Sequence, residues 1–496
     1  MTLPFADPQA VRVAAAAASH AQPEVPSECV EQAIRRQLEP GFPRWQRLIA
    51  SSGFCHRPVR LDGKVVASGE SSARTIYDSK DEPDGQLLVR CGNRRASVCP
   101  PCSRTYAGDV WHLLQAGIAG GTKGVPRAVA GNPSWFVTLT GPSFGSVHGQ
   151  GCGRGRAGRS ASGGRPGSAK VTCSHGRTTR CPITHDDDDP RLGTPICPDC
   201  YDYTGAAAFN AKAPELWRRF TIALRRRCAD ELELPERQLG SIMRISFAKV
   251  AEFQARGVVH FHAIIRLDGP EVPYAPWPAN LSNLDLPNLM RESAASGFLA
   301  ASTDDGVRAL RFGDQLDIRR VVGDTDDDGH VTPQKVAAYI AKYSTKAAED
   351  FGLISGVRTA EAAALHGLSP HVVRMLRAVE RLATQPEFAG IERWVHMLGF
   401  RGHFTTKSRA FSVTLGELRG ARAAHRQADG FPLGDGIDRA GVAGHSESTL
   451  VVGSWKFRGL GHLSPGDLLL TTRVYTEHLE ALDHAREEQQ LATDYP

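Results

Sequence analysis

The sequence lacks the features that mark a membrane protein or an ATP-driven motor. No apolar run approaches the ~18 residues needed to span a bilayer. No basic flank precedes the alanine stretch near the N-terminus, so we expect no signal peptide. A G-x-x-x-x-G-K-S/T phosphate-binding loop and internal repeats are also missing. These absences predict a cytoplasmic protein with no membrane partner and no ATP-driven motor activity of its own.

The composition is that of a folded, weakly basic chain. Lys and Arg outnumber Asp and Glu by 59 to 54, which gives a formal net charge of +5. Hydrophobic residues make up 41% of the sequence, which is enough for packed cores and excludes wholesale disorder. At roughly 150 residues per domain, the length of 496 residues predicts two to four domains.

Cysteines form the strongest local pattern. In a reducing compartment, clustered thiols bind metal more often than they form disulfides. Two C-x-x-C pairs, each with two more cysteines upstream, have the arrangement that holds one tetrahedral Zn²⁺. The two predicted quartets are Cys55, Cys91, Cys99 and Cys102, and Cys173, Cys181, Cys197 and Cys200. The alternative ligands are His56, His175 and His185, and the alternative interpretation is free or redox thiols. Cys29, Cys152 and Cys228 are left over.

Several segments between these cysteines can be assigned from composition and periodicity. Residues 145–170 are rich in Gly, Ser and Arg and predict a flexible basic loop. Residues 28–50 and 214–229 predict helices, the second with an apolar stripe that ends at Cys228 and arginines on its other side. A strand is expected at 135–140.

A predicted hairpin carries the first candidate site. Residues 242–252 and 258–267 predict two strands around a three-residue loop that ends in Gly257. The period of two puts His260 and His262 on one face, and this register sets Glu252 directly opposite His260. Two imidazoles and one carboxylate suit a divalent metal, Mg²⁺ or Mn²⁺, with Zn²⁺ also open. Gln254 is the alternative third ligand, and stacked or core histidines are the alternative interpretation.

A predicted helix carries two tyrosines at helical spacing. Thr332 and Pro333 form a helix start, and Tyr339 and Tyr343, four apart, share one face. Lys342 and Lys346 each follow a tyrosine by three residues, so a Tyr-x-x-Lys unit occurs twice. A tyrosine pair packed on a core is the alternative.

These residue types suit attack on a phosphodiester. A free tyrosine has a pKa near 10, so ionising it at pH 7 costs about 4 kcal/mol, part of which a neighbouring ammonium can offset. A metal that binds a non-bridging phosphate oxygen stabilises the charge of the transition state. Attack by the phenolate would leave a phosphotyrosine and a free hydroxyl.

Three motifs resemble those of the HUH endonuclease superfamily, in that family's order: FVTLT at 136–140, HFHAII at 260–265 and YIAKYSTK at 339–346. The phrases FVTLTGPSFG, EFQARGVVHFH, CPDCYDYTGA and HMLGFRGHFTTKSR resemble replication-initiator proteins of actinobacterial plasmids and integrative elements. The resemblance implies metal ligation by His260 and His262, nucleophilic tyrosines at 339 and 343, and a helix lysine at Lys342. It is less specific about Glu252, because third ligands vary in that family.

The resemblance also implies an activity and partners. It implies nicking of single-stranded or hairpin origin DNA, a 5′-phosphotyrosine and a 3′-hydroxyl that primes rolling-circle replication of a plasmid. Since the sequence has no phosphate loop, we expect a host helicase to unwind the duplex. The rivals are a relaxase or transposase with the same chemistry, and a zinc-dependent DNA-binding regulator without catalysis.

We therefore expect an α+β protein with an antiparallel-sheet HUH domain. A helix and a zinc module would occupy 1–125. The nickase domain would span 126–350, with the basic loop and second zinc module inserted at about 145–205. A mostly helical region would follow over 351–496. Within it, residues 359–376 resemble a helix-turn-helix, with two plain core helices as the alternative.

DNA binding requires cationic side chains that neutralise phosphates. The candidates come from the basic loop at 145–170, the arginine-rich helix face at 218–227, the tyrosine helix, and the segment RGHFTTKSR at 401–409. Ordinary solvated basic surface is the alternative for each. The predicted DNA-binding residues are Arg218, Arg225, Lys346, Arg401, Lys407 and Arg409.

Overall fold

The computed structural model describes residues 26–68, 73–150, 152, 172–270, 272–281, 283–323, 330–346, 351–354, 356–428 and 450–494. Most of the predicted basic loop at 145–170 lies outside these residues. Among the described helices, none has the length and apolar character to cross a membrane. Contacts group the chain into two compact units, Met1–Leu113 with Thr414–Pro496, and Leu114–Val413. The division into three domains stays a prediction.

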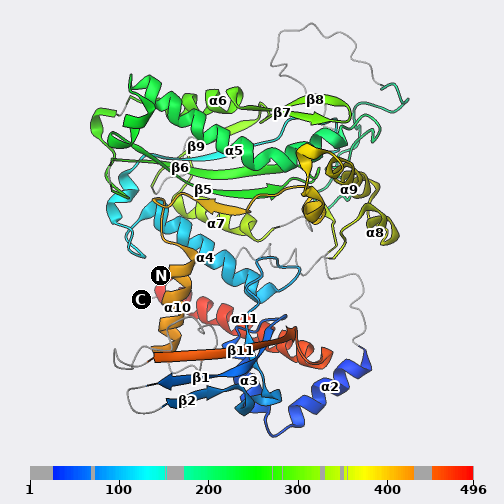
Figure 1. Ribbon diagram of the computed structural model, residues 1–496, viewed down its shortest axis with the longest axis vertical. Coiled ribbons are helices and arrows are strands. Elements are labelled where there is room, and N and C mark those ends of the chain that lie inside the picture. The colour runs from blue at the N-terminus through cyan, green and yellow to red at the C-terminus, as the bar shows by residue number, and fades with distance from the viewer. Residues whose placement is uncertain are drawn as a thin grey trace. The chain divides into compact units, whose positions relative to one another are not determined.

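The second unit is built on a five-stranded sheet in the order β10-β5-β6-β4-β9 (Figure 1). Every neighbouring pair in it is antiparallel, as the α+β prediction expects. The strands are β4 (Ser134–Leu139), β5 (Arg244–Phe253), β6 (Val259–Asp268), β9 (Leu316–Val321) and β10 (Thr405–Lys407).

Helices cover both faces of this sheet, with α5 and α7 on opposite sides (Figure 1). The second unit also contains a separate two-stranded hairpin, β7 with β8. The elements are α5 (Tyr203–Glu231), α6 (Leu286–Ser296), α7 (Pro333–Ser344), α8 (Ala360–Leu365), α9 (Pro370–Ala383), β7 (Phe298–Thr303) and β8 (Gly306–Arg311). The predicted start of α7 is confirmed, since the Thr332 hydroxyl accepts a hydrogen bond from the Lys335 amide.

Alternation along the strands separates an apolar face from a polar one. On the α5 side, the Trp217 ring of α5 lies 5.3 Å from the Phe247 ring and 5.9 Å from the Phe261 ring. Residues 260 and 262 are offset by one from Phe261 and therefore point to the α7 side. Because Phe247 and Phe261 pack against Trp217 of α5, the alternate residues of β5 and β6 must face α7.

The segment at 359–376 forms α8 and the start of α9, joined by a turn in which Gly367 has φ 68°. The apolar residues of α9, from Val372 to Leu382, are buried, and α9 packs against α5. A recognition helix needs an exposed face for the major groove. The burial of α9 therefore agrees with the alternative of two core helices.

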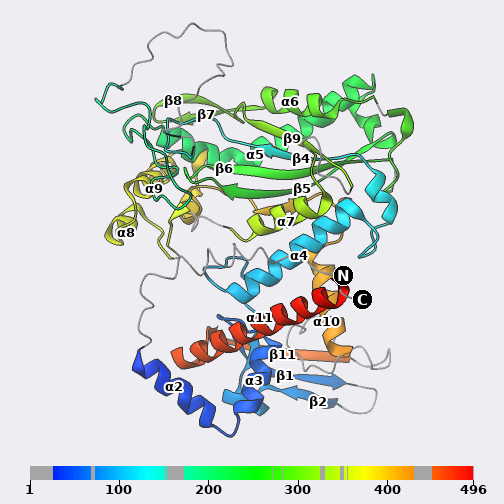
Figure 2. The same cartoon turned by 180° about the vertical axis from the view of Figure 1, so that it is seen from behind.

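The first unit contains a sheet in the order β11-β1-β2, with β3 also paired to β1. Figure 2 shows α11 and α3 from the side on which they are most visible, and α11 packs against α2. The elements are α2 (Ser27–Leu38), α3 (Phe42–Ser51), β1 (Val59–Ser68), β2 (Ala73–Asp78), β3 (Leu87–Val89), α4 (Pro100–Ala119), α10 (Leu415–Ala428), β11 (Leu450–Leu460) and α11 (Pro465–Asp494).

Two expectations about this unit differ from the structure. The single helix predicted at 28–50 is split into α2 and α3, because Pro40, Gly41 and Pro43 interrupt the helical hydrogen bonds. The C-terminal region also contributes β11, which pairs along the length of β1. That pairing joins residues almost 400 positions apart and leaves no local signal in the sequence.

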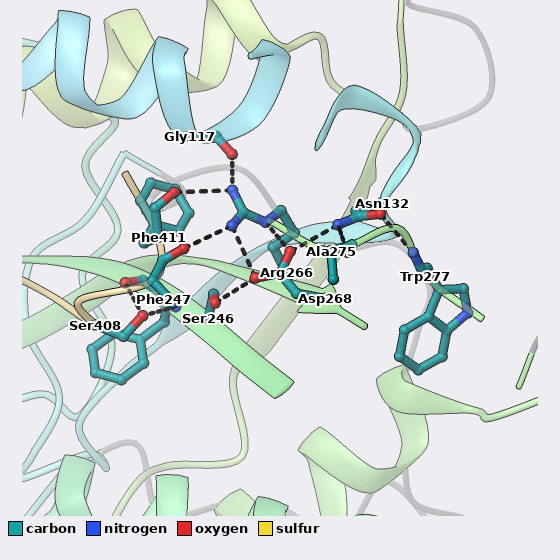
Figure 3. A network of polar contacts seen from close by, with 11 residues as sticks. Gly117, Asn132, Ser246, Phe247, Arg266, Asp268, Ala275, Trp277, Ser408 and Phe411 are labelled. Atoms are coloured by element: carbon teal, nitrogen blue, oxygen red, sulfur yellow. Dashed lines mark hydrogen bonds and ion pairs between the residues drawn. The ribbon is translucent and has the colours of Figure 1, made fainter. Parts of the chain in front are cut away.

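A buried polar network closes the end of the second unit's sheet that lies away from the β5–β6 turn (Figure 3). Arg266 is fully buried and donates to both carboxylate oxygens of Asp268, at 2.6 and 2.9 Å. It also donates to the backbone oxygens of Gly117, Ala410 and Phe411. Asp268 further accepts from Ser246 at 2.5 Å and Asn132 at 2.8 Å. One ion pair thus joins β5, β6, the segment after β10 and the last residues of α4, which belong to the second unit.

We expect Arg266→Met to destabilise the second unit by about 3–5 kcal/mol, because it leaves the Asp268 carboxylate buried without its cation. Urea denaturation measures this change. The combined change Arg266→Met with Asp268→Leu should recover part of the loss, since no unpaired charge remains. Arg225→Met, on an exposed position of α5, is the control. A single variant as stable as the wild type would contradict a structural role for the pair.

Candidate functional site

The β5–β6 hairpin brings one carboxylate and two imidazoles together in the predicted register. Glu252 pairs with His260 and Val250 with His262. One Glu252 carboxylate oxygen lies 3.0 Å from Nε2 of His260 and 3.3 Å from Nε2 of His262. The three candidate ligand atoms all lie within 4.8 Å of one another. Gln254, the alternative ligand, instead accepts a hydrogen bond from Arg256 within the turn.

The surroundings keep Glu252 and His262 in the protonation states that metal ligation requires. Burial raises the pKa of Glu252, but hydrogen bonds from His260 and His262 and the charge of Lys346 outweigh it and lower the pKa to about 2. Burial lowers the pKa of His262, against the opposing effect of Glu252. At neutral pH the carboxylate is therefore ionised and the His262 ring neutral, as cation binding needs.

Two residues of β4 orient His262. The hydroxyl of Thr138 lies 3.0 Å from Nδ1 of His262, and the Phe136 ring stacks on the imidazole at 5.6 Å. A hydrogen bond at Nδ1 leaves Nε2 facing the carboxylate, which is the usual orientation of a metal-bound histidine. The mixed N and O donors fit a divalent cation such as Mg²⁺, Mn²⁺ or Zn²⁺.

Helix α7 places both tyrosines over this group. The rings of Tyr339 and Tyr343 are 4.4 Å apart, and they lie 5.1 and 5.7 Å from the His262 ring. Tyr339 keeps 40% of its surface exposed, so a strand of DNA could reach it. The phenols and imidazoles thus meet at one side of the sheet.

The electrostatics around the tyrosines make a nearby cation important. Burial, together with Tyr343 and the charge of Glu252, raises the pKa of Tyr339, which Arg319 only partly opposes. Lys346 lies 4.3 Å from the centre of the Tyr343 ring and 3.0 Å from Glu252. Lys342, in contrast, is exposed on α7. The structure therefore brings Lys346 rather than Lys342 to the centre of the group.

The first predicted cysteine quartet is assembled in the first unit. Cys55, Cys91, Cys99 and Cys102 come together with their sulfurs within 4.8 Å of one another. The sulfur of Cys55 lies 3.7 Å from that of Cys99 and 3.6 Å from that of Cys102. On a tetrahedral zinc with Zn–S bonds of about 2.3 Å, two sulfurs stand about 3.8 Å apart. Four thiols at this spacing fit Zn²⁺.

The second quartet differs from the prediction in one member. Cys173, Cys197 and Cys200 group with His175, whose Nδ1 lies 3.2 Å from the Cys200 sulfur. Cys181 lies in a separate group with His148 and His185. The physical reason is a tight turn at Gly176, with φ 70°, which returns His175 to the thiols and carries the later Cys181 past them.

Comparison with known proteins places the chain in a family. Residues 41–476 match the RepSA family, described as "Replication initiator protein, pSAM2". The chain is also 40% identical over 452 residues to a replication initiator protein of Streptomyces ambofaciens. This match covers 89% of the present chain and 91% of the relative. The chain belongs to this replication initiator family. No solved structure matches it.

The predicted DNA-binding residues of this initiator fall in different surroundings. On the face of α5 turned away from the sheet, Arg218 and Arg225 are exposed, and a groove of about 600 Å³ runs between α5 and Phe298. Arg218 is held by Glu215 at 2.6 Å. Since α7 lies on the other side of the sheet, this face is remote from the tyrosines (Figure 1).

The segment after α9 also divides. Arg401 and Arg409 are exposed, but the Lys407 ammonium donates to the backbone oxygen of Ser412 at 2.7 Å and so supports its own loop. Two contributions escaped the sequence analysis, the Thr138 hydroxyl and the contact of Lys346 with Glu252. Thr138 belongs to the recognised FVTLT strand, but only its pairing opposite His262 reveals its contact.

We expect Glu252→Gln to weaken Mn²⁺ binding by about tenfold or more, because it removes the only negative charge among the three ligands; even partners of metal ligands contribute on this scale. Titration calorimetry on protein freed of loosely bound metal measures the affinity. Glu361→Gln, an exposed acid on α8, is the matched control. Equal Mn²⁺ affinity of the Glu252 variant and the wild type would contradict the site.

Proposed function

We propose that this replication initiator nicks and joins single-stranded origin DNA through a tyrosine nucleophile, as an HUH endonuclease. The observation that carries the proposal is the meeting of two phenols with a Glu–His–His group, 5.1 and 5.7 Å from His262. Family membership supports the biological setting, replication of a plasmid or integrative element. The substrate would be an origin strand, single or in an extruded hairpin.

The chemistry divides among the chain's own residues. Tyr339 or Tyr343 attacks the phosphorus of the scissile phosphodiester as a phenolate. The new bond joins the tyrosine oxygen to phosphorus, the bond to the 3′-oxygen breaks, and that oxygen takes up a proton. The products are a 5′-phosphotyrosine and a 3′-hydroxyl that can prime synthesis. Glu252, His260 and His262 would hold Mg²⁺ or Mn²⁺, which would supply positive charge to stabilise the transition state.

The second tyrosine provides a nucleophile for a second strand transfer. The two rings lie 4.4 Å apart on one helix face, so either phenol can approach the same phosphate position. A second nick can then be made while the first covalent link persists. This arrangement favours an initiator, which must both open the origin and rejoin the displaced strand.

Lys346 is placed to favour the phenolate of Tyr343. Its ammonium contacts the Tyr343 ring and Glu252, and positive charge near a phenol lowers the cost of ionisation. Lys342 and the exposed residues Arg401 and Arg409 would meet DNA phosphates instead. Arg218 and Arg225 would contact DNA only away from the cleavage point, because they lie on the α5 side.

Two rival functions differ from this proposal, one in its biological setting and the other in its chemistry. A relaxase or transposase would use the same covalent step, and family membership favours replication over either. A zinc-dependent DNA-binding regulator would bind DNA without a covalent product. The meeting of tyrosines and metal-binding side chains disfavours the regulator, which needs neither.

Because the sequence contains no phosphate loop, we assign unwinding of the duplex to a host helicase in the cytoplasm.

We expect Tyr339→Phe combined with Tyr343→Phe to abolish covalent capture of DNA, because no phenol remains at the site. The measurement uses end-labelled single-stranded origin DNA with Mn²⁺, run on a denaturing gel. Tyr106→Phe, in the first unit, is the matched control and should capture DNA as the wild type does. The two single variants show which tyrosine acts first. Persistent capture by the double variant would refute the nucleophile assignment.

We expect Lys346→Gln to slow covalent capture by roughly tenfold or more and to move the rising limb of its pH dependence upward, because the phenolate loses its neighbouring charge. Rapid-quench kinetics over a pH series measures both effects. Lys342→Gln is the control and should change DNA affinity more than the pH profile. The reverse pattern would return the catalytic role to Lys342, as the family resemblance implies.

A further inference from the structure

A third group of metal-binding side chains lies in the segment between β4 and α5. Nε2 of His185 is 3.2 Å from Nδ1 of His148 and 3.2 Å from the sulfur of Cys181. The candidate ligand atoms of these three residues all lie within 4.8 Å of one another. None of the three belongs to the Cys173 group, so this is a separate cluster.

Cys152 lies next to Cys181 of this group. The Cys181 thiol forms a hydrogen bond with the Cys152 thiol as well as with His185. The Cys152 thiol also accepts a hydrogen bond from the Gly149 amide at 3.3 Å. A thiol that contacts Cys181 and accepts an amide hydrogen bond is placed as a ligand sulfur commonly is.

The orientation of His185 is suited to a metal ligand. Its Nδ1 lies 2.7 Å from a carboxylate oxygen of Asp189, which Arg191 holds in turn. When Nδ1 donates to the carboxylate, Nε2 of the neutral ring has one lone pair. That lone pair faces both the His148 nitrogen and the Cys181 sulfur and can accept only one hydrogen bond. A cation among them would satisfy all three at once.

We propose that Cys152, Cys181, His148 and His185 bind a Zn²⁺ ion, as a structural site in addition to the two cysteine-rich ones. Two thiolates and two imidazoles form a closed tetrahedral set, which is typical of structural rather than catalytic zinc. The Asp189 carboxylate fixes the tautomer of His185, as carboxylates do for zinc-bound histidines. The proposal does not depend on the nicking activity.

The segment that carries this site is linked to the β5–β6 hairpin. His148 pairs through its backbone with Gly193 and Thr194, at 2.8 and 2.9 Å. Gly193 packs against Ala255 in the turn of the β5–β6 hairpin, so closely that an added Cβ would lie 2.2 Å from the Ala255 backbone. Zinc at this site would therefore stabilise the segment around Gly193, which packs against the turn between Glu252 and His260.

The test is the zinc content of the purified full-length chain, measured by plasma mass spectrometry after dialysis. We expect Cys181→Ser to lose one zinc per chain relative to the wild type. Cys173→Ser should lose a different one, and the double variant should lose two. Cys29→Ser, a cysteine outside all the clusters, should keep the wild-type count.

Three outcomes would overturn the proposal. Wild-type zinc content in Cys181→Ser would remove the site, and loss of only one zinc in the double variant would merge it with the Cys173 site. Unchanged zinc in Cys152→Ser would exclude the fourth ligand. If Cys181→Ser does not fold, as judged by gel filtration and circular dichroism, His148→Ala provides the same comparison and must also lose one zinc.

Discussion

The register between β5 and β6 is the constraint on which the candidate site depends. A slip of one residue would turn His260 and His262 into the core and the aromatic set toward α7. Two features fix the register at the turn. Gly257 adopts φ 74°, which favours glycine. Asn210, buried on α5, donates to the Gly257 oxygen and accepts from the Val259 amide, both at 2.9 Å. The helix that packs the apolar face therefore also holds the turn that aligns the polar one.

Glu252 is the point at which the separate elements of the site meet. It contacts both histidines of β6 and Lys346 beyond the end of α7, while β4 supports the group through Thr138. One buried carboxylate thus balances several cationic or proton-donating partners. Against the effect of burial, the hydrogen bonds from the histidines and the charge of Lys346 keep the pKa of this acid low. The ionised carboxylate then supplies the negative charge that a divalent ion requires.

Side-chain positions within a strand or helix could be predicted from the sequence, because they follow a regular spacing. Positions that depend on a turn or a helix end could not. Alternation gave the pairing of Glu252 with His260, and the spacing of four gave the shared face of Tyr339 and Tyr343. Lys342 and Lys346 look equivalent by spacing, but α7 ends at Ser344, so only Lys346 is released from the helix to turn toward Glu252. In the same way, the turn at Gly176 places His175 rather than Cys181 in the group with Cys173, Cys197 and Cys200. Both cases depend on where regular structure stops, which periodicity does not encode.

The two polar clusters on the α7 side of β6 show why one is structural and the other suited to chemistry. Arg266 has five N–H donors, and the network uses its Nε and both terminal nitrogens on Asp268 and three backbone oxygens. It is fully buried and has no capacity left for a ligand. Around Glu252 the situation is reversed: the histidine nitrogens and carboxylate oxygens converge on one another, and Tyr339 beside them is 40% exposed. The first cluster is satisfied by the protein itself, whereas the second has donor atoms that a cation can bind.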